Sequence, residues 1–231
     1  MGVSESISRF SDFYKRHGLL ASLSRTWQGL KRTVHLNRML VFYCDLAKLP
    51  AGPKSVPTTL KVERLIDYSA LGKHDLEVLT SFWHPKQAHR NIKERFEKRA
   101  SLWLIKWDQQ IAGYCWTIQG RTIAPYYFPL GRDDVQVFDW FVFPKFRGRG
   151  VHWFLVSHIL QTLASEGMSR AFGDVAAWNQ ASLASYKMTA FRRLGWVRSF
   201  TLFGITVVSW AGNGTLDESD RSPVRAPDVS H

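Results

Sequence analysis

A glycine-rich turn with the composition of a phosphate-binding loop follows an apolar stretch near the middle of the chain. Residues 135–143 are mostly β-branched or aromatic, which predicts a strand, and Pro144 ends it because proline cannot donate to a strand ladder. Gly148 and Gly150 follow, and apolar residues spaced by three and four from Val151 onward predict a helix. The start of such a helix offers unpaired N–H groups and a positive dipole end to an anion. The pattern indicates a site for a phosphorylated ligand, although it is also that of an ordinary basic loop.

A second group of residues that could do chemistry lies further along the chain. Asn179 precedes a predicted helix, Ser182 lies in its first turn, Tyr186 follows, and Ala190-Phe191 comes after the helix. A tyrosine, with an ordinary pKa near 10, can protonate a departing thiolate whose pKa is about 8.5. The alternatives are a core tyrosine on an amphipathic helix and, for the asparagine, a helix N-cap.

Together the two groups resemble the Gcn5-related N-acetyltransferase (GNAT) family. That family has a strand ending in Pro-x-x-Arg-Gly-x-Gly and, downstream, Asn, then Ser or Ala, then Tyr, then Gly-Phe. The resemblance covers residues 60–210, with the motifs confined to 137–151 and 179–191. It implies an α/β fold, a mixed β-sheet with a splayed central strand pair and helices on both faces. The sequence departs from the family pattern at Lys145 (often Gln or Arg), His152 (often a third Gly) and Ala190 (usually Gly).

The resemblance also implies how acetyl-CoA would be held. The coenzyme would lie between the two splayed strands, with its pantetheine arm on strand backbone and its diphosphate on the glycine turn. Tyr186 would be the general acid, and Asn179 would contact the pantetheine or the acceptor. The remaining coenzyme-binding positions that this implies are Phe141, Val142, Phe143, Arg147, Gly148, Arg149, Gly150, Val151 and His152.

Asp139 is the one acidic residue in the apolar strand. A carboxylate in such surroundings is expected to be partly desolvated, which suits it to accept a proton directly or through water. Members of the resembling family often carry an acidic residue near this point. The alternatives are a salt-bridged strand aspartate, with His84 or water as the base.

Aromatic and basic residues before the hairpin at 101–119 and within 121–134 are candidates for an acceptor pocket. Such side chains suit a sugar or nucleotide face, but they are also ordinary pocket walls. The candidates are Trp83, His84, His89, Arg90, Trp116, Arg121, Tyr126 and Tyr127.

The function implied by the resemblance is direct transfer of an acetyl group from acetyl-CoA to a primary amine, with no metal and no covalent enzyme intermediate. A small anionic acceptor, such as an amino sugar or sugar nucleotide, fits the positive charge, and protein or peptide amines stay open. The alternatives are a non-catalytic acyl-CoA sensor, and a basic N-terminal segment that binds a membrane or, less favoured, nucleic acid. A homodimer and the acyl chain length are also open.

The order of predicted elements agrees with a mixed sheet covered by helices, in one domain at 60–210. Residues 1–59 are expected to be a basic extension: a helix from Gly18 to about Val34, a strand-like segment at 38–46 and a Pro/Gly linker. Residues 211–231 are expected to be a disordered tail. The domain's predicted strands are 60–65, 101–107, 111–119, 135–143, 171–177, 191–200 and 202–210, and its predicted helices are 70–83, 85–98, 151–166 and 180–189.

Charge and composition set the remaining limits. The net charge of +12 implies anionic ligands or surfaces, and residues 1–60 carry half of it. The chain has no apolar run of membrane-spanning length and no uninterrupted apolar stretch typical of a secretory signal. Cys44 and Cys115 are expected to be buried free thiols. We therefore expect a cytoplasmic protein, with a peripheral membrane contact through the basic extension left open.

Overall fold

The computed structural model of the protein describes residues 38–49, 57–81, 85–123, 127, 129–202 and 205–211. The expected N-terminal helix, most of the expected linker, and the expected tail from residue 212 lie outside the described residues. So do three acceptor candidates: Trp83, His84 and Tyr126.

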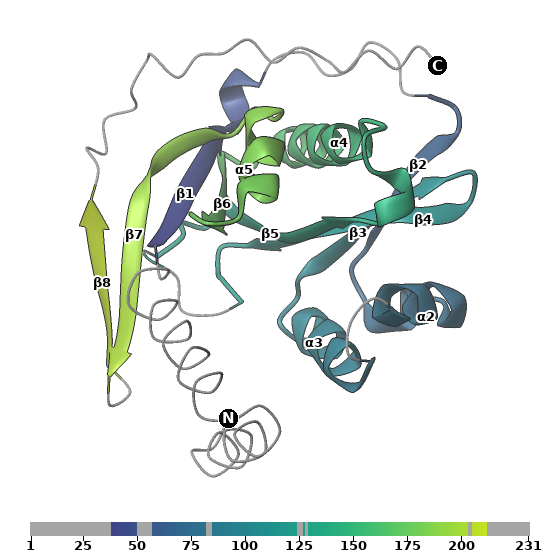
Figure 1. Ribbon diagram of the computed structural model, residues 1–231, viewed down its shortest axis with the longest axis horizontal. Coiled ribbons are helices and arrows are strands. Elements are labelled where there is room, and N and C mark those ends of the chain that lie inside the picture. Colours follow the sequence, from purple (N-terminus) through teal and green to yellow (C-terminus); the bar gives the residue numbers. More distant parts are fainter. Residues whose placement is uncertain are drawn as a thin grey trace, which may run out of the picture.

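The fold is one mixed β-sheet with helices on both faces (Figure 1), as the resemblance implied. The eight strands lie in the order β2-β3-β4-β5-β6-β1-β7-β8, and β5 and β6 form the one parallel pair among the described strands. Helices α2 and α3 cover one face, and α4 and α5 cover the other. The elements are β1 (Arg38–Asp45), η1 (Leu46–Lys48), β2 (Leu60–Leu65), η2 (Tyr68–Ala70), α2 (Lys73–Ser81), α3 (Pro85–Glu97), β3 (Ser101–Trp107), β4 (Gln110–Gln119), β5 (Asp134–Val142), η3 (Pro144–Phe146), α4 (Val151–Ser165), β6 (Arg170–Ala176), α5 (Gln180–Lys187), β7 (Arg192–Leu202) and β8 (Ile205–Ala211).

Local sequence signals account for most of these boundaries. Pro85 is the first residue of α3. Proline is tolerated at this position because the first N–H groups of a helix have no acceptor within the helix. Asp108 and Gln109 both have positive φ and form the tight turn between β3 and β4. Gly167, with φ of 83°, follows the end of α4.

The first described strand corrects the expected domain boundary. The segment at 38–46 does form a strand, but β1 is not part of an appendage: it pairs with β6 on one side and β7 on the other. The sheet therefore begins at Arg38 rather than at Leu60. A run of apolar residues such as Met39 to Cys44 is what a strand buried on both faces requires.

Two hydrophobic clusters fill the two sides of the sheet. One packs α4 against the sheet, with Leu155 and Ile159 fully buried. The other packs α2 and α3 against β3 and β4, around Leu102 and Trp116. The site described below draws on both sides, because side chains of a strand alternate between them.

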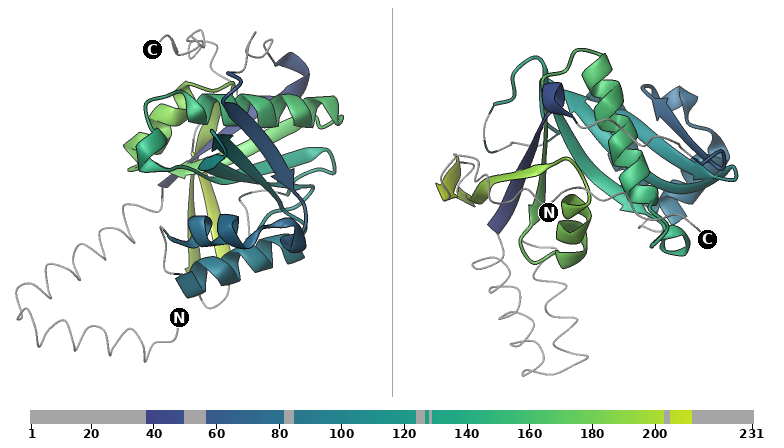
Figure 2. Two further views of the ribbon diagram at one scale, coloured as in Figure 1. Left: turned by 90° about the vertical axis from the view of Figure 1, so that its right-hand side faces the viewer. Right: turned by 90° about the horizontal axis from the view of Figure 1, so that it is seen from above.

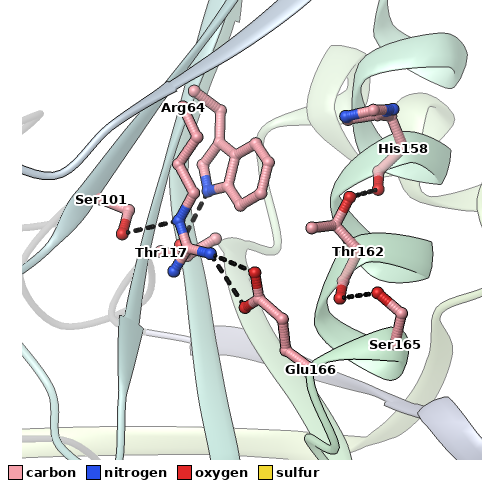
Figure 3. A network of polar contacts seen from close by, with 8 residues as sticks. Arg64, Ser101, Thr117, His158, Thr162, Ser165 and Glu166 are labelled. Carbon is pink, nitrogen blue, oxygen red and sulfur yellow. Dashed lines mark hydrogen bonds and ion pairs between the residues drawn. The ribbon is translucent and has the colours of Figure 1, made fainter.

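A polar network fixes the C-terminal end of α4 to the sheet (Figure 3). The guanidinium of Arg64 on β2 donates through Nη1 to both carboxylate oxygens of Glu166, at 2.7 and 2.8 Å. Its Nε donates to the hydroxyl of Ser101 at 3.1 Å. Trp103, under the Arg64 guanidinium, donates to Thr117 at 2.8 Å. These bonds join three strands to the end of the helix whose start forms the glycine turn.

Candidate active site

The parallel strands β5 and β6 diverge near the middle of the sheet. They pair over three residue pairs only, from Asp134 with Arg170 to Gln136 with Phe172. Beyond this point β5 continues with β4, and β6 continues with β1. The divergence confirms the expected splayed pair and leaves a wedge between the two strands.

The hydroxyl of Tyr186 lies at the point where the wedge begins. A Cβ atom added to Gly173, the first β6 residue after the parallel pairing, would lie 2.4 Å from the tyrosine oxygen. The same atom would lie 3.0 Å from the carbonyl oxygen of Val137, the corresponding residue of β5. The phenol therefore reaches the floor of the wedge only because residue 173 has no side chain.

Aromatic rings hold Tyr186 in this position. Its ring stacks on Phe42 of β1, with centroids 4.1 Å apart, and packs against Trp140 at 4.4 Å and Phe191 at 5.5 Å. Only 3% of the tyrosine is exposed. Burial of this kind restricts the ring, so the hydroxyl is oriented before any ligand binds.

The start of α5 shows one of the two roles considered for Asn179. Its side-chain oxygen accepts a hydrogen bond from the N–H of Ser182 at 3.2 Å, so Asn179 is the N-cap of the tyrosine-bearing helix. The cap places Tyr186 two turns further along. A coenzyme contact of Asn179 stays a prediction.

The glycine turn has the backbone that anion binding requires. Gly148 and Gly150 have φ of 76° and 72°, in the region that favours glycine. Gly150 is the N-cap of α4, so no capping side chain competes for the N–H groups of the first turn, which carries no acidic residue. Figure 2 shows α4 and α5 side by side on one face of the sheet, so this turn and Tyr186 flank the same face.

The basic side chains around the turn are already engaged at its edges. Arg147 donates through Nε to the carbonyl of Val142 at 3.1 Å, and Lys145 donates to Gln110. The guanidinium of Arg149 lies over the ring of Trp107. Arg147 and Arg149 are both exposed, so their charge is available to a diphosphate on the turn.

The backbone at the end of β5 leaves fewer groups for the pantetheine arm than the three residues expected. The N–H of Phe143 donates to Ala112, and the carbonyl of Phe141 lies close to Gly113, so both face β4. Backbone groups of an antiparallel strand alternate between its two neighbours. Val142 is thus the residue of the three whose carbonyl, bonded to Arg147, is turned to the open edge.

His152 in the first turn of α4 is packed rather than open. Its ring lies edge-on to Trp140, with centroids 4.8 Å apart, and burial lowers its pKa to about 4. Its Nε2 is buried and has no hydrogen-bond partner. The imidazole is therefore neutral and fills the space that a smaller residue would leave.

A β-bulge in β5 places Phe138 and Asp139 on the same face of the sheet, where Arg95 contacts both. Tyr114 pairs with Phe141 and Trp116 with Phe138, so two β5 residues lie opposite Cys115. Asp139 has φ of 48° and points toward α3, whereas Trp140 contacts Tyr186 on the other face. Without the bulge, the regular alternation along the strand would turn Asp139 away from α3.

Asp139 forms a salt bridge in the structure, as the alternative interpretation had it, and its role as the base stays a prediction. Its side chain is 38% exposed and forms an ion pair with Arg95 of α3 at 2.5 Å. The guanidinium also lies over the rings of Trp116 and Phe138. Any contact of Asp139 with an acceptor would therefore require its ion pair with Arg95 to open.

Asp139 and Arg95 belong to a pocket of about 400 Å³ between α3 and the sheet. This size suits a small molecule, and a few polar groups converge on apolar walls. We call it the acceptor pocket. Its lining residues are Leu79, Gln87, Ala88, Asn91, Ile92, Arg95, Leu102, Tyr114, Trp116 and Asp139.

Of the other acceptor candidates in the described part of the chain, only Trp116 lines this pocket. His89 and Arg90 lie on α3 and are exposed, and Arg121 lines a different cavity. Tyr127 bonds to Asp174 at 3.1 Å, and burial raises the pKa of its phenol.

Sequence reasoning missed the polar stripe of α3 that faces the pocket. Gln87, Asn91 and Arg95 recur every four residues, which places them on one side of a helix. The four-residue spacing was visible in the sequence, but the solvent-exposed face of an ordinary helix has the same spacing. Only the position of α3 over Asp139 distinguishes the two.

Three further observations concern the cysteines, metal ligands and membrane-spanning helices. Cys44 and Cys115 are both buried free thiols, as expected, and burial raises the pKa of Cys44 to about 12. Within the described ranges, no three His, Cys, Asp or Glu side chains gather as metal ligands would. None of the described helices is long and apolar enough to cross a bilayer.

Comparison with known proteins agrees with this geometry. The model of the acetyltransferase (GNAT) family matches residues 69–191, a range that excludes β1, β2, β7 and β8. No curated protein matches the chain. A GCN5-related N-acetyltransferase from Sphaerobacter thermophilus shares the fold, with a TM-score of 0.50 and 14% identity over 76% of this chain and 54% of its own.

A second solved structure is described as a GNAT-family acetyltransferase from Novosphingobium aromaticivorans DSM 12444. It has a TM-score of 0.44 and 16% identity, over 71% of this chain and 62% of its own. The chain thus spans between half and two thirds of these two structures.

Proposed function

The chain belongs to the GNAT acetyltransferase family, and we propose that it transfers an acetyl group from acetyl-CoA to a primary amine of a small anionic acceptor. The observation that carries the proposal is the position of the Tyr186 hydroxyl at the start of the wedge, against Gly173. A proton donor fixed there serves a leaving group that enters between β5 and β6.

The glycine turn fits the diphosphate of the coenzyme. The left-handed glycines leave the first-turn N–H groups of α4 uncovered, and the adjacent arginines add positive charge. The carbonyl of Val142 is the strand group best placed for the pantetheine arm. The thioester would then lie between the turn and Tyr186.

The two faces of the sheet separate the two substrates. Tyr186 is on α5, which with α4 covers one face of the sheet, whereas the acceptor pocket is lined by α3 on the other face, and the wedge would connect the two. In this arrangement Asp139 would bind the ammonium of the acceptor and take its proton, directly or through water. Tyr186 would protonate the thiolate of coenzyme A as it departs.

The charge of the pocket supports an anionic acceptor. Arg95 is only 18% exposed in its side chain and lies between Asp139 and the aromatic wall. When an ammonium group binds Asp139, the guanidinium can turn to an anionic group of the same molecule. Such an exchange would make acceptor binding the event that separates the ion pair.

A thiol-release assay tests the proposal. Purified protein is mixed with acetyl-CoA and separate panels of amino sugars, sugar nucleotides, amino acids, polyamines and peptides. We expect release with at least one small anionic amine, and loss of release in Tyr186→Phe with coenzyme binding retained. Coenzyme binding without release on any panel would contradict the transfer function.

A further inference from the structure

A cavity lined by three arginines lies at the far end of the β4–β5 hairpin from the glycine turn. It has a volume of about 530 Å³ and is lined by Arg99, Gln119, Gly120, Arg121 and Arg132. We call it the arginine hollow. We propose that it binds a multiply charged anionic group, phosphate in the first instance, and that this group belongs to the acceptor.

The charge of the hollow is uncompensated. All three arginines are exposed, no carboxylate is among the lining residues, and none of the three forms an ion pair within the described ranges. Guanidinium groups that share a cavity repel one another. A bound anion would reduce this repulsion. Their planar donors suit the oxygens of a phosphate or carboxylate.

Backbone contacts hold Arg132 in the hollow. Asp134, 3% exposed, accepts from the N–H of Gly131 at 2.7 Å and is bound by two nitrogens of Arg170 at 2.8 and 2.9 Å. The side chain of Gln119 donates to the Arg132 carbonyl at 3.2 Å. These bonds fix the backbone on both sides of Arg132, from Gly131 to Asp134.

The position of Arg99 points to the same use. It follows the end of α3, where Ala100 donates back to Arg95, and it has φ of 61°. This left-handed conformation at a helix end is usually taken by glycine. The backbone conformation of Arg99 is unfavourable for a residue with a side chain. Its guanidinium is one of the three that line the hollow.

Residues close to one another along the chain line the hollow and the acceptor pocket. Arg95 near the end of α3 lines the pocket, and Arg99, just beyond the end of α3, lines the hollow. On β4, Trp116 lines the pocket and Gln119 the hollow, about 10 Å apart at the rise of a strand. An acceptor whose amine reaches Asp139 could thus place a phosphate among the three arginines. This assignment to the acceptor rests on the proposed function, whereas anion binding does not.

Inorganic pyrophosphate tests the anion site without any acetyl transfer. It is titrated calorimetrically into the full chain, with and without saturating coenzyme A, so that binding at the glycine turn is separated. We expect coenzyme-insensitive binding that weakens at least tenfold in each of Arg99→Gln, Arg121→Gln and Arg132→Gln. Arg193→Gln, an exposed arginine on β7, is the matched control and should bind as the original chain does. Equal binding by the triple variant, or none by the original chain, would overturn the proposal.

A matched pair of amines assigns the anion to the acceptor. 6-Aminohexyl phosphate and 6-aminohexanol differ only in the phosphate, and the extended chain covers the span between pocket and hollow. Each is tested as an inhibitor of pyrophosphate binding and as an acceptor for acetyl-CoA. We expect the phosphate to compete for the hollow and to have the lower KM, a difference that the triple variant abolishes. Arginine-dependent binding of both pyrophosphate and the aminoalkyl phosphate without acetyl transfer would contradict the proposed function and leave the anion site standing. An equal KM for the two amines would show that the hollow serves a free anion instead.

Discussion

The hydroxyl oxygen of Tyr186 occupies the place of the side chain that Gly173 lacks. A Cβ on residue 173 would lie 2.4 Å from that oxygen, closer than real Cβ contacts come. The relationship joins α5 to the strand β6 at the point where β6 leaves β5. Because the contact depends on a single methyl group, it can be tested with conservative substitutions.

Gly173→Ala should lower both stability and activity. The added methyl group must displace the phenol or the Val137 carbonyl, and overpacking of this kind costs about 1–3 kcal/mol. Urea denaturation and thiol release measure the two effects. In Gly173→Ala/Tyr186→Phe the nearest atom is gone, so the stability cost of the alanine should be smaller than in the single variant. Strictly additive free energies would contradict the contact.

Tyr186→Phe should reduce kcat while leaving the KM for acetyl-CoA nearly unchanged. Phenylalanine keeps the stacking on Phe42 and removes only the proton donor. General acid catalysis contributes roughly 10²–10⁴-fold in rate. Steady-state thiol release gives both constants, with Tyr43→Phe on β1 as the control. Unchanged kcat in Tyr186→Phe would remove the tyrosine from the mechanism.

Asp139→Asn should lower kcat/KM by roughly 10²-fold at pH 7 if Asp139 takes the proton of the amine. The deficit should shrink as the pH rises, because the amine then loses its proton without help. Arg95→Gln should instead raise the KM of an anionic acceptor, because it removes the cation that would bind the anionic group. Lys93→Gln, on the exposed side of α3, is the control. A pH-independent deficit in Asp139→Asn would favour a purely structural role.

His152 should make the protein less stable in acid. Its pKa is lowered from 6.5 to about 4 in the folded state, so between these values the unfolded chain binds a proton that the folded chain does not. The free energy of unfolding therefore falls as the pH drops through this window, by up to about 3 kcal/mol. Urea denaturation at pH 7, 5 and 4 should show a smaller loss in His152→Phe than in the original chain. The exposed His74→Phe should leave the loss unchanged.

A chain that begins at Leu60 should not fold. It lacks β1, which pairs with both β6 and β7 and supplies Phe42 to the tyrosine. Circular dichroism of purified 60–231 should show little cooperative unfolding. Val41→Asp in the full chain tests the same strand with a single substitution. Val41 is fully buried, and an unpaired carboxylate there should strongly destabilise the fold. A stable fragment 60–231 would contradict the central place of β1.

The contrast between these elements shows where sequence reasoning works. The β3–β4 hairpin, the end of β5 and the start of α3 are set by neighbouring residues: two turn residues, Pro144 and Pro85. Local signals of this kind are readable without a structure. The strand character of 38–45 was readable for the same reason, but its pairing with β6 and β7 was not, since those partners lie more than a hundred residues away.

The same limit applies to the site. Gly148, Gly150 and Tyr186 carry spacing that identifies them in the sequence. The ion pair of Asp139 with Arg95 depends on a bulge that turns one strand residue toward α3. No residue in the sequence predicts that bulge. Gly173 likewise looks like any strand glycine until the tyrosine is placed above it.

A crystal structure of the protein with bound coenzyme A measures the central claim most directly. We expect the diphosphate on the N–H groups that follow Gly150, and the sulfur within hydrogen-bond reach of the Tyr186 oxygen. A coenzyme bound elsewhere, or a sulfur remote from the tyrosine with the turn in contact, would contradict the account.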